Sequence, residues 1–240
     1  SPNVSISSNS PLCTGNTLQL NASGGSSYQW SGVGGFSSTQ QNPTIPNAQL
    51  INQGTYTVTV TSSSGCTATA STDVYISSSF NSTINPAGPF CSNGSPVTLT
   101  AATPGGTWSG NGITDASLGI FNPTTAGVGT HTITYTISGS CGSSSNANII
   151  VYQSPTAIVS SNSPICEGQS LQLNANNVSN ASYLWSGPNS FSSSQQNPTL
   201  NNASINNSGS YSLTITDANQ CSAISSINVT INPSPTVTIT

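Results

Sequence analysis

Six cysteines and a single histidine are the side chains of this 240-residue chain best suited to chemistry. Cysteine and histidine can bind zinc, and a cysteine or serine beside a base can act as a nucleophile. No C-x-x-C pair occurs and His131 has no second histidine to work with, so neither zinc binding nor nucleophilic catalysis is favoured. An even number of regularly spaced cysteines instead predicts disulfides in an oxidising compartment outside the cytoplasm.

His131 is expected to pack rather than to catalyse. The segment GTHTITYT alternates polar and apolar residues, which places His131 on the same face of a strand as Ile133 and Tyr135. It also takes the position that Tyr56 and Tyr211 hold in two related segments. A role at the edge of a hydrophobic core is therefore predicted for this histidine.

The acidic residues do not form a candidate site either. They are Asp73, Asp115, Glu167 and Asp217, at unrelated positions of the sequence. Glycoside hydrolysis needs two carboxylates facing one bond, and calcium needs six or more oxygen ligands, usually with several carboxylates. Asp115, in the segment NGITDASLG, is the one weak candidate for calcium. The sequence therefore predicts no catalytic, cofactor-binding or metal-binding residue, and no enzyme.

The composition excludes further classes of function. Charged residues make up 2% of the chain, and it contains no lysine and no arginine. Binding to nucleic acid or to anionic lipid depends on those two residue types, so neither is predicted. The longest apolar run, IIVY at 149–152, is far shorter than the roughly 18 residues that a membrane-spanning helix needs, so no membrane insertion is predicted.

The elements that position the cysteines belong to a repeated unit. The order cysteine, tryptophan, cysteine occurs three times: Cys13, Trp30, Cys66; Cys91, Trp108, Cys141; and Cys166, Trp185, Cys221. YQWSGVGGFSSTQQNPTI in the first copy closely matches YLWSGPNSFSSSQQNPTL in the third, while the second copy is divergent. The predicted units are residues 1–78, 79–154 and 155–233, and SPTVTIT at 234–240 repeats the opening of a unit and predicts the first strand of a fourth.

Each unit is predicted to contain strands alone. Apolar residues fall on every second position, as in Tyr56, Val58 and Val60, and turn-forming segments separate these runs. About seven short strands per unit predict an all-β fold of tandem immunoglobulin-like antiparallel β-sandwiches in a rod-like array. Proline in the links VYQSP (151–155) and INPSP (231–235) is expected to stiffen the rod.

One disulfide within each unit is favoured, above a buried tryptophan, as in immunoglobulin domains. The favoured pairs are Cys13–Cys66, Cys91–Cys141 and Cys166–Cys221, over the other connectivities. Reduction is then expected to destabilise each unit markedly. The predicted core residues are Trp30, Trp108, Trp185, Tyr56 and Tyr211.

The segments CTGNTLQLNAS, YQWSG and GTYTVTVTSSSGCTATA resemble the Ig-like and PKD-like repeats of very large surface proteins of Bacteroidota. Those proteins are similar to gliding adhesins and to extracellular hook or fibre proteins exported by type IX secretion. The resemblance implies a secreted, extracellular protein at the cell surface. It covers all three units, strongly in the first and third.

The function expected from these observations is a structural segment of a surface adhesin or extracellular filament, which forms a stiff stalk. The alternatives are an array that binds glycans or surfaces, for which Phe36, Phe90 and Phe191 are candidate contacts, or a spacer beside a secreted enzyme. Sheet edges without lysine or arginine predict side-by-side association with identical chains, by edge pairing or by exchange of a first strand. Any cell-surface target is expected at a distant tip.

Overall fold

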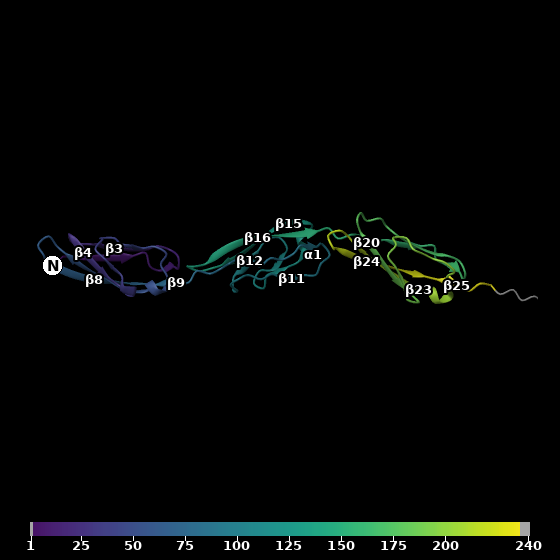
Figure 1. Ribbon diagram of the computed structural model, residues 1–240, viewed down its shortest axis with the longest axis horizontal. Coiled ribbons are helices and arrows are strands. Elements are labelled where there is room, and N and C mark those ends of the chain that lie inside the picture. The colour runs from purple at the N-terminus through teal and green to yellow at the C-terminus, as the bar shows by residue number, and fades with distance from the viewer. Residues whose placement is uncertain (1, 236–240) are drawn as a thin grey trace, which may run out of the picture.

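The computed structural model describes residues 2–235 and shows three β-sandwiches in a line, one after another along the chain (Figure 1). The chain is all-β, and its immunoglobulin-like sandwiches follow one another in tandem. The predicted first strand of a fourth repeat, at 234–240, lies almost wholly outside the described residues. None of the described helices is long and apolar enough to span a membrane.

The first repeat consists of two antiparallel sheets that enclose a core. One sheet has the spatial order β1 (Ser5–Ser8), β3 (Leu18–Ser23) and β6 (Thr44–Ile45). The facing sheet has the order β5 (Ser37–Ser38), β4 (Ser27–Ser31), β7 (Gly54–Thr61) and β8 (Thr67–Val74). A short parallel pair, β2 (Leu12–Cys13) with β9 (Ile76–Ser77), closes the end from which the chain leaves. Two short 3-10 helices, η1 (Val33–Gly35) and η2 (Leu50–Asn52), lie in the connections.

The third repeat has the same plan. Its first sheet contains β17 (Val159–Ser161), β19 (Leu171–Ala175) and β22 (Thr199–Leu200). Its second sheet contains β21 (Phe191–Ser193), β20 (Ser182–Gly187), β23 (Gly209–Thr216) and β24 (Ser222–Val229). The parallel pair is β18 (Ile165–Cys166) with β25 (Ile231–Asn232), and the 3-10 helix is η3 (Ile205–Asn207).

The second repeat keeps the two-sheet plan with different details, as its divergent sequence suggested. One sheet contains β11 (Val97–Thr98), β14 (Ile120–Phe121) and β13 (Ile113–Asp115). The other contains β10 (Phe90–Cys91), β16 (Ser143–Tyr152), β15 (Gly129–Ile137) and β12 (Thr107–Ser109). A single helical turn, α1 (Pro123–Ala126), precedes β15, and the Asn122 side chain caps it by accepting from the backbone N–H of Thr124 at 3.0 Å. Here β10 pairs in parallel with β16.

Each sandwich has a hydrophobic core of its own, built by the alternation of side chains along its strands. In β7, Tyr56, Val58 and Val60 are each 0% exposed, and the threonines between them point outward. The aromatic residues at the centres of the three cores are all buried: Trp30, Trp108, Trp185, Tyr56, Tyr135 and Tyr211. Because the buried residues alternate with polar ones, each repeat can bury one face of each sheet and leave the other in water.

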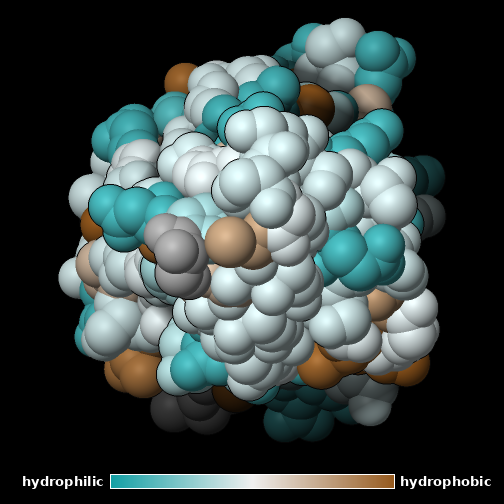
Figure 2. Space-filling view, turned by 90° about the vertical axis from the view of Figure 1, so that its left-hand side faces the viewer, coloured by the Kyte–Doolittle hydropathy of each residue, from teal (hydrophilic) through white to brown (hydrophobic). Residues whose placement is uncertain are grey.

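The outer faces are covered by hydroxyl and amide side chains that pair across strands. Thr57 bonds to Ser71 at 2.8 Å between β7 and β8, and Thr134 donates to Asn146 at 2.8 Å between β15 and β16. Figure 2 looks at the N-terminal end of the molecule, where pale and teal surface dominates and brown, hydrophobic residues are scattered. The end of the molecule seen in this view is therefore mainly polar, although charged residues make up only 2% of the chain.

Candidate functional site at the junctions between repeats

The two disulfides of the described chain lie between repeats, not within them. Cys13 in the first repeat is bonded to Cys141 in the second, with a Cα–Cα distance of 5.4 Å. Cys91 in the second repeat is bonded to Cys221 in the third, with a Cα–Cα distance of 5.5 Å. The disulfides span 128 and 130 residues of sequence, so each one joins consecutive sandwiches.

The pairing favoured from the sequence is therefore wrong. Cys13–Cys66, Cys91–Cys141 and Cys166–Cys221 do not form, and Cys66 and Cys166 are exposed cysteines outside any disulfide. The core around each tryptophan is filled by carbon side chains: in the first repeat Trp30 lies opposite Val58, with Leu18 and Leu20 in the same cluster.

The physical reason is that the two cysteines of one repeat lie at opposite ends of its sandwich. Cys13 pairs in register with Ser77, at the end where the chain leaves the repeat. Cys66 lies in the turn between β7 and β8, and the chain runs from this turn along β8 before it reaches β9 and Ser77. About 30 Å of extended strand separates these ends at about 3.3 Å per residue, whereas disulfide-bonded Cα atoms lie within about 7 Å.

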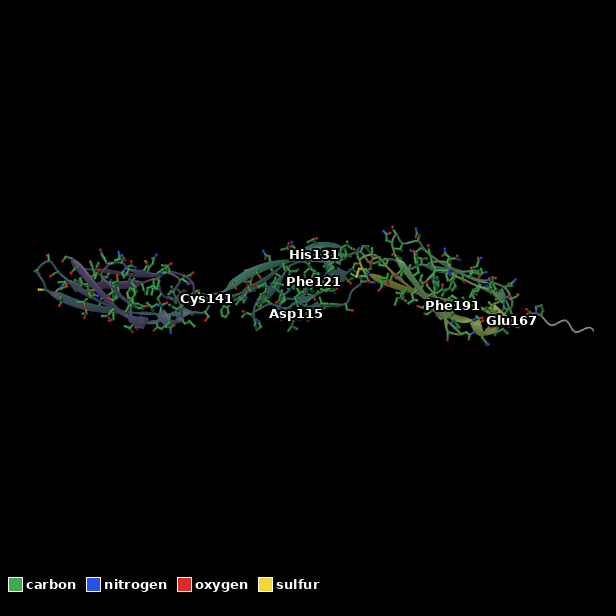
Figure 3. The ribbon with its side chains drawn as sticks, viewed as in Figure 1. Asp115, Phe121, His131, Cys141, Glu167 and Phe191 are labelled. Atoms are coloured by element: carbon green, nitrogen blue, oxygen red, sulfur yellow. A yellow bond between two sulfur atoms is a disulfide. The ribbon has the colours of Figure 1, made fainter. Side chains whose placement is uncertain are left out.

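The first junction contains hydrogen bonds beside its disulfide. Ser79, in the link between repeats, donates its backbone N–H to the Thr14 hydroxyl at 3.0 Å, and the two hydroxyls also lie 3.0 Å apart. On the other side of the link, the Ser143 hydroxyl donates to the Phe80 carbonyl at 2.8 Å. Cys141 lies between the first and second sandwiches (Figure 3) and is buried. The link is thus tied to both repeats.

The second junction is built in a related way around Ser154, which is 7% exposed. Its backbone N–H donates to the Ser92 hydroxyl at 3.0 Å, and its own hydroxyl donates to the Asn93 side-chain oxygen at 2.6 Å. The Asn93 amide nitrogen then donates to the carbonyl of Ser222 in the third repeat at 2.9 Å. Because these polar groups are paired, the link can be buried without an unsatisfied donor or acceptor.

The residues of these links were missed by sequence reasoning, which used the links only for their prolines. A signal was present: a serine recurs at the same place in each link, as Ser79, Ser154 and Ser234. Ser154 and Ser234 stand directly before a proline, and because Ser-Pro is common in turns, these serines did not indicate a junction.

His131 replaces a tyrosine at an equivalent place. The hydroxyl groups of Tyr56 and Tyr211 donate to the carbonyl four residues earlier, at 2.8 and 2.9 Å. The His131 Nε2 atom lies 2.8 Å from the Gly127 carbonyl, also four residues earlier, and so acts as the donor. The Nδ1 atom faces the Asn111 amide nitrogen at 3.2 Å and accepts from it. Both ring nitrogens are thus occupied in holding a corner of the second sandwich.

Asp115 holds a turn. One of its carboxylate oxygens accepts from the Leu118 backbone N–H at 2.9 Å, from the Ser117 hydroxyl at 2.7 Å and from the Ser117 N–H at 2.9 Å. The hydrogen bond from the Leu118 N–H has the largest effect in lowering the pKa of Asp115 below its ordinary value. The hydrogen bonds from Ser117 lower this pKa further. In Figure 3, Asp115 and His131 lie at opposite edges of the second sandwich. Among the described residues, no group of three or more His, Cys, Asp or Glu side chains could hold a metal ion.

The aromatic candidates for a binding surface pack inward. Phe36 stacks edge-on against Tyr56 with ring centroids 5.4 Å apart, and Phe191 does the same against Tyr211 at 5.3 Å. Phe90 lies against Phe121 at 5.7 Å. Each is half-buried, which leaves little ring face for a sugar.

One pocket of about 220 Å³ opens in the second repeat. Leu99, Pro104, Trp108, Leu118 and Tyr135 contribute to its lining. Its lining holds no pair of titratable side chains.

No family model matches the chain, and no curated protein matches it. Among solved structures, immunoglobulin domains 1–5 of Sidekick-1 align with 97% of this chain at 13% identity and a TM-score of 0.39, and the chain spans 59% of that fragment. Three N-terminal domains of the outer capsid protein Hoc of bacteriophage RB49 align with 98% of this chain at 14% identity and a TM-score of 0.36, over 100% of that chain. Extracellular domains 3–5 of Drosophila OTK align with 92% at 12% identity and a TM-score of 0.34, over 93% of that chain. The two disulfides among the described residues indicate an oxidising location.

Proposed function

We propose that this chain is a stiff, non-enzymatic stalk segment of a secreted cell-surface adhesin or extracellular filament. The observation that carries the proposal is that both disulfides join consecutive repeats. The resemblance of the repeats to those of Bacteroidota surface proteins supports the same setting, including export by type IX secretion.

A second covalent connection changes how two domains can move. Domains joined by a single peptide link move relative to one another unless their interface is large and hydrophobic. Here each pair of neighbours is joined by the peptide link and by a disulfide, and the link is hydrogen-bonded by Ser79 or Ser154. Two separated covalent connections restrict bending and twisting at the junction, which is what a stalk requires.

The disulfides also protect the stalk against extension. They overlap, because Cys91 lies within the segment that the Cys13–Cys141 disulfide closes. Force applied to the ends of the chain therefore passes through both disulfides, even if all three sandwiches unfold. An appendage that holds a cell to a surface benefits from such a limit.

Small-angle X-ray scattering tests the proposal. The Cys66→Ser/Cys166→Ser variant keeps both junction disulfides and is expected to scatter as one extended rod. The matched variant in which all six cysteines are replaced by serine is expected to show a smaller mean radius of gyration and a broad spread of conformations. Scattering that is the same for both variants would overturn the claim that the disulfides stiffen the chain.

A further inference from the structure

In the first and third repeats, two amide side chains bond to the backbone of one alanine. Gln41 donates to the Ala22 carbonyl at 2.9 Å, and the Asn42 side-chain oxygen accepts from the Ala22 N–H at 3.2 Å. The third repeat has the same two bonds, each 3.0 Å long. The residues that form them there are Gln196, Asn197 and Ala175. We call this arrangement the amide clamp.

The second repeat has no amide clamp. Its Leu99 N–H donates to the Gly119 carbonyl at 2.8 Å, and the equivalent bond of the first repeat goes to the Pro43 carbonyl at 3.0 Å. The two residues before Pro43 are the Gln-Asn pair of the clamp, whereas the two residues before Gly119 are Ser117 and Leu118. They belong to the turn that begins at Asp115, on the lower edge of the second sandwich in Figure 3. Neither side chain is a carboxamide.

Ala101 takes the place of the clamped alanine. It pairs with Ile84 across an antiparallel bridge, as Ala22 pairs with Ile6. The hydrogen bonds of this bridge are made by the residues on either side of Ala101, so its own N–H and carbonyl point to the opposite side of the strand. Among the described residues, none bonds to either group. Ala101 lines the pocket of about 220 Å³.

The Trp108 indole adds a third open group. In the other two repeats the tryptophan donates its Nε1–H to the carbonyl of Gln40 or Gln196, at 3.0 or 3.2 Å. The Trp108 Nε1 atom has no acceptor in the described part of the chain. No buried side-chain nitrogen or oxygen there lacks a partner, so this atom reaches solvent. A Cβ atom at Gly119 would lie 2.6 Å from it, so the missing side chain leaves space beside the donor.

From this comparison we infer that the pocket binds the side-chain carboxamide of a glutamine or asparagine in a segment of a partner protein. The carboxamide bonds to the N–H and carbonyl of Ala101, as the amide clamp does in the other repeats. The Trp108 indole N–H donates to a further oxygen of the segment. The stem of the side chain packs on Leu99 and Leu118, which also line the pocket. The inference adds an adhesive contact to the chain and does not depend on the stalk function.

The chemistry of the pocket favours a primary carboxamide over other ligands. No charged side chain lines it and the chain has no lysine or arginine, so an ionic ligand gains no counter-charge. The N–H and carbonyl of one extended residue point to the same side, and a primary carboxamide offers a donor and an acceptor side by side. The secondary amide of an acetylated sugar is trans and presents these groups on opposite sides, so it satisfies only one of them.

Nuclear magnetic resonance of the ¹⁵N-labelled chain tests the inference, because the three tryptophans give three indole N–H signals. The probe is an end-blocked peptide with the sequence SSTQQNPTI of residues 37–45. It is expected to shift the Trp108 indole and Ala101 backbone signals in a saturable way, and to leave the other two indole signals in place. The dissociation constant is expected to be on the order of 1 mM, since so small a pocket surrounds few ligand atoms. The control peptide carries Gln40→Glu, Gln41→Glu and Asn42→Asp, which removes the amide donors, and is expected to cause no shift.

A matched pair of variants tests the site itself. Ser117→Gln/Leu118→Asn supplies the second repeat with an amide clamp of its own, and Leu118 is 61% exposed, so the core is not disturbed. This variant is expected to weaken peptide binding roughly tenfold or more, and to unfold at a higher denaturant concentration because Ala101 gains partners. Ser117→Ala loses the same hydroxyl bond to Asp115 but leaves the pocket open, and is expected to keep binding the peptide.

Several results would overturn the inference. They are an unchanged Trp108 signal at about 10 mM peptide, equal shifts with the control peptide, and undiminished binding by a folded Ser117→Gln/Leu118→Asn variant. Shifts caused by N-acetylglucosamine and not by the peptide would assign the pocket to a sugar instead. Shifts that appear when the chain alone is concentrated would assign it to a second copy. None of these results bears on the stiffness of the chain, which the scattering experiment measures separately.

Discussion

Single hydrogen bonds from aromatic side chains fix one corner of each sandwich. Tyr56 and Tyr211 donate to the Asn52 and Asn207 carbonyls, and His131 donates to Gly127 in the same geometry. A tyrosine corner of this kind is a feature of immunoglobulin-like sandwiches. The sequence placed His131 correctly in the series with the two tyrosines, but alternation could not reveal the carbonyl that it bonds.

Replacing Tyr211 by phenylalanine is expected to lower the free energy of unfolding of the third repeat by about 1–3 kcal/mol, because the buried Asn207 carbonyl loses its donor. The control is Tyr75→Phe, since Tyr75 is 61% exposed. Chemical denaturation of both variants provides the measurement, and equal stabilities would contradict the role of the corner.

The effect of Tyr211→Phe on stability is also expected to depend on pH. Burial raises the pKa of Tyr211 above its ordinary value of about 10, so the folded state holds its proton more tightly than the unfolded state. The contribution of Tyr211 to the free energy of unfolding is fully present below about pH 10. It is lost as the pH rises through the raised pKa. The stability difference between the original chain and Tyr211→Phe should therefore shrink above about pH 10. A difference that stays constant to higher pH would contradict this.

At the scale of the elements, alternation and turn composition were enough to predict the strands. They also predicted the sandwich plan and the buried tryptophans, because burial depends on local period and residue type. The disulfide partners could not be predicted in this way, since they depend on which end of a sandwich each cysteine occupies. The available hint was that Cys66 and Cys221 stand in turn-forming segments, SSSGC and DANQC, rather than inside strands. A cysteine in a hairpin turn lies at an end, where a neighbouring repeat can reach it.

Reduction should therefore leave each sandwich folded, in contrast to the sequence-based expectation of marked destabilisation. No described disulfide crosses a core, and the tryptophans are enclosed by carbon side chains. Tryptophan emission is expected to keep its buried wavelength after reduction and in the Cys13→Ser/Cys141→Ser variant. A red shift on reduction would show that the junction disulfides hold the cores together.

At the scale of the whole molecule, the overlapping disulfides set a limit on length. The shortest covalent path between the ends of the chain runs to Cys13, across to Cys141, back to Cys91 and across to Cys221. This path includes roughly a third of the residues, on the order of 300 Å when extended, against on the order of 800 Å for the reduced chain.

Single-molecule pulling should show this difference directly. With a tether at each end, the oxidised chain is expected to stop extending at about a third of the length that it reaches after reduction. Cys66→Ser/Cys166→Ser is the matched control and should behave like the oxidised chain, because it retains both junction disulfides. Equal final lengths before and after reduction would contradict the overlapping connectivity.

A disulfide map of the unreduced chain tests most directly whether the disulfides join consecutive repeats. Trypsin has no site because lysine and arginine are absent, so chymotrypsin, which cuts after aromatic residues, is the suitable protease. The map should be made on protein whose free thiols are blocked before digestion, with mass spectrometry of the linked peptides. We expect the pairs Cys13–Cys141 and Cys91–Cys221, with Cys66 and Cys166 blocked as thiols. Linked peptides that join Cys13 to Cys66, or Cys166 to Cys221, would contradict it.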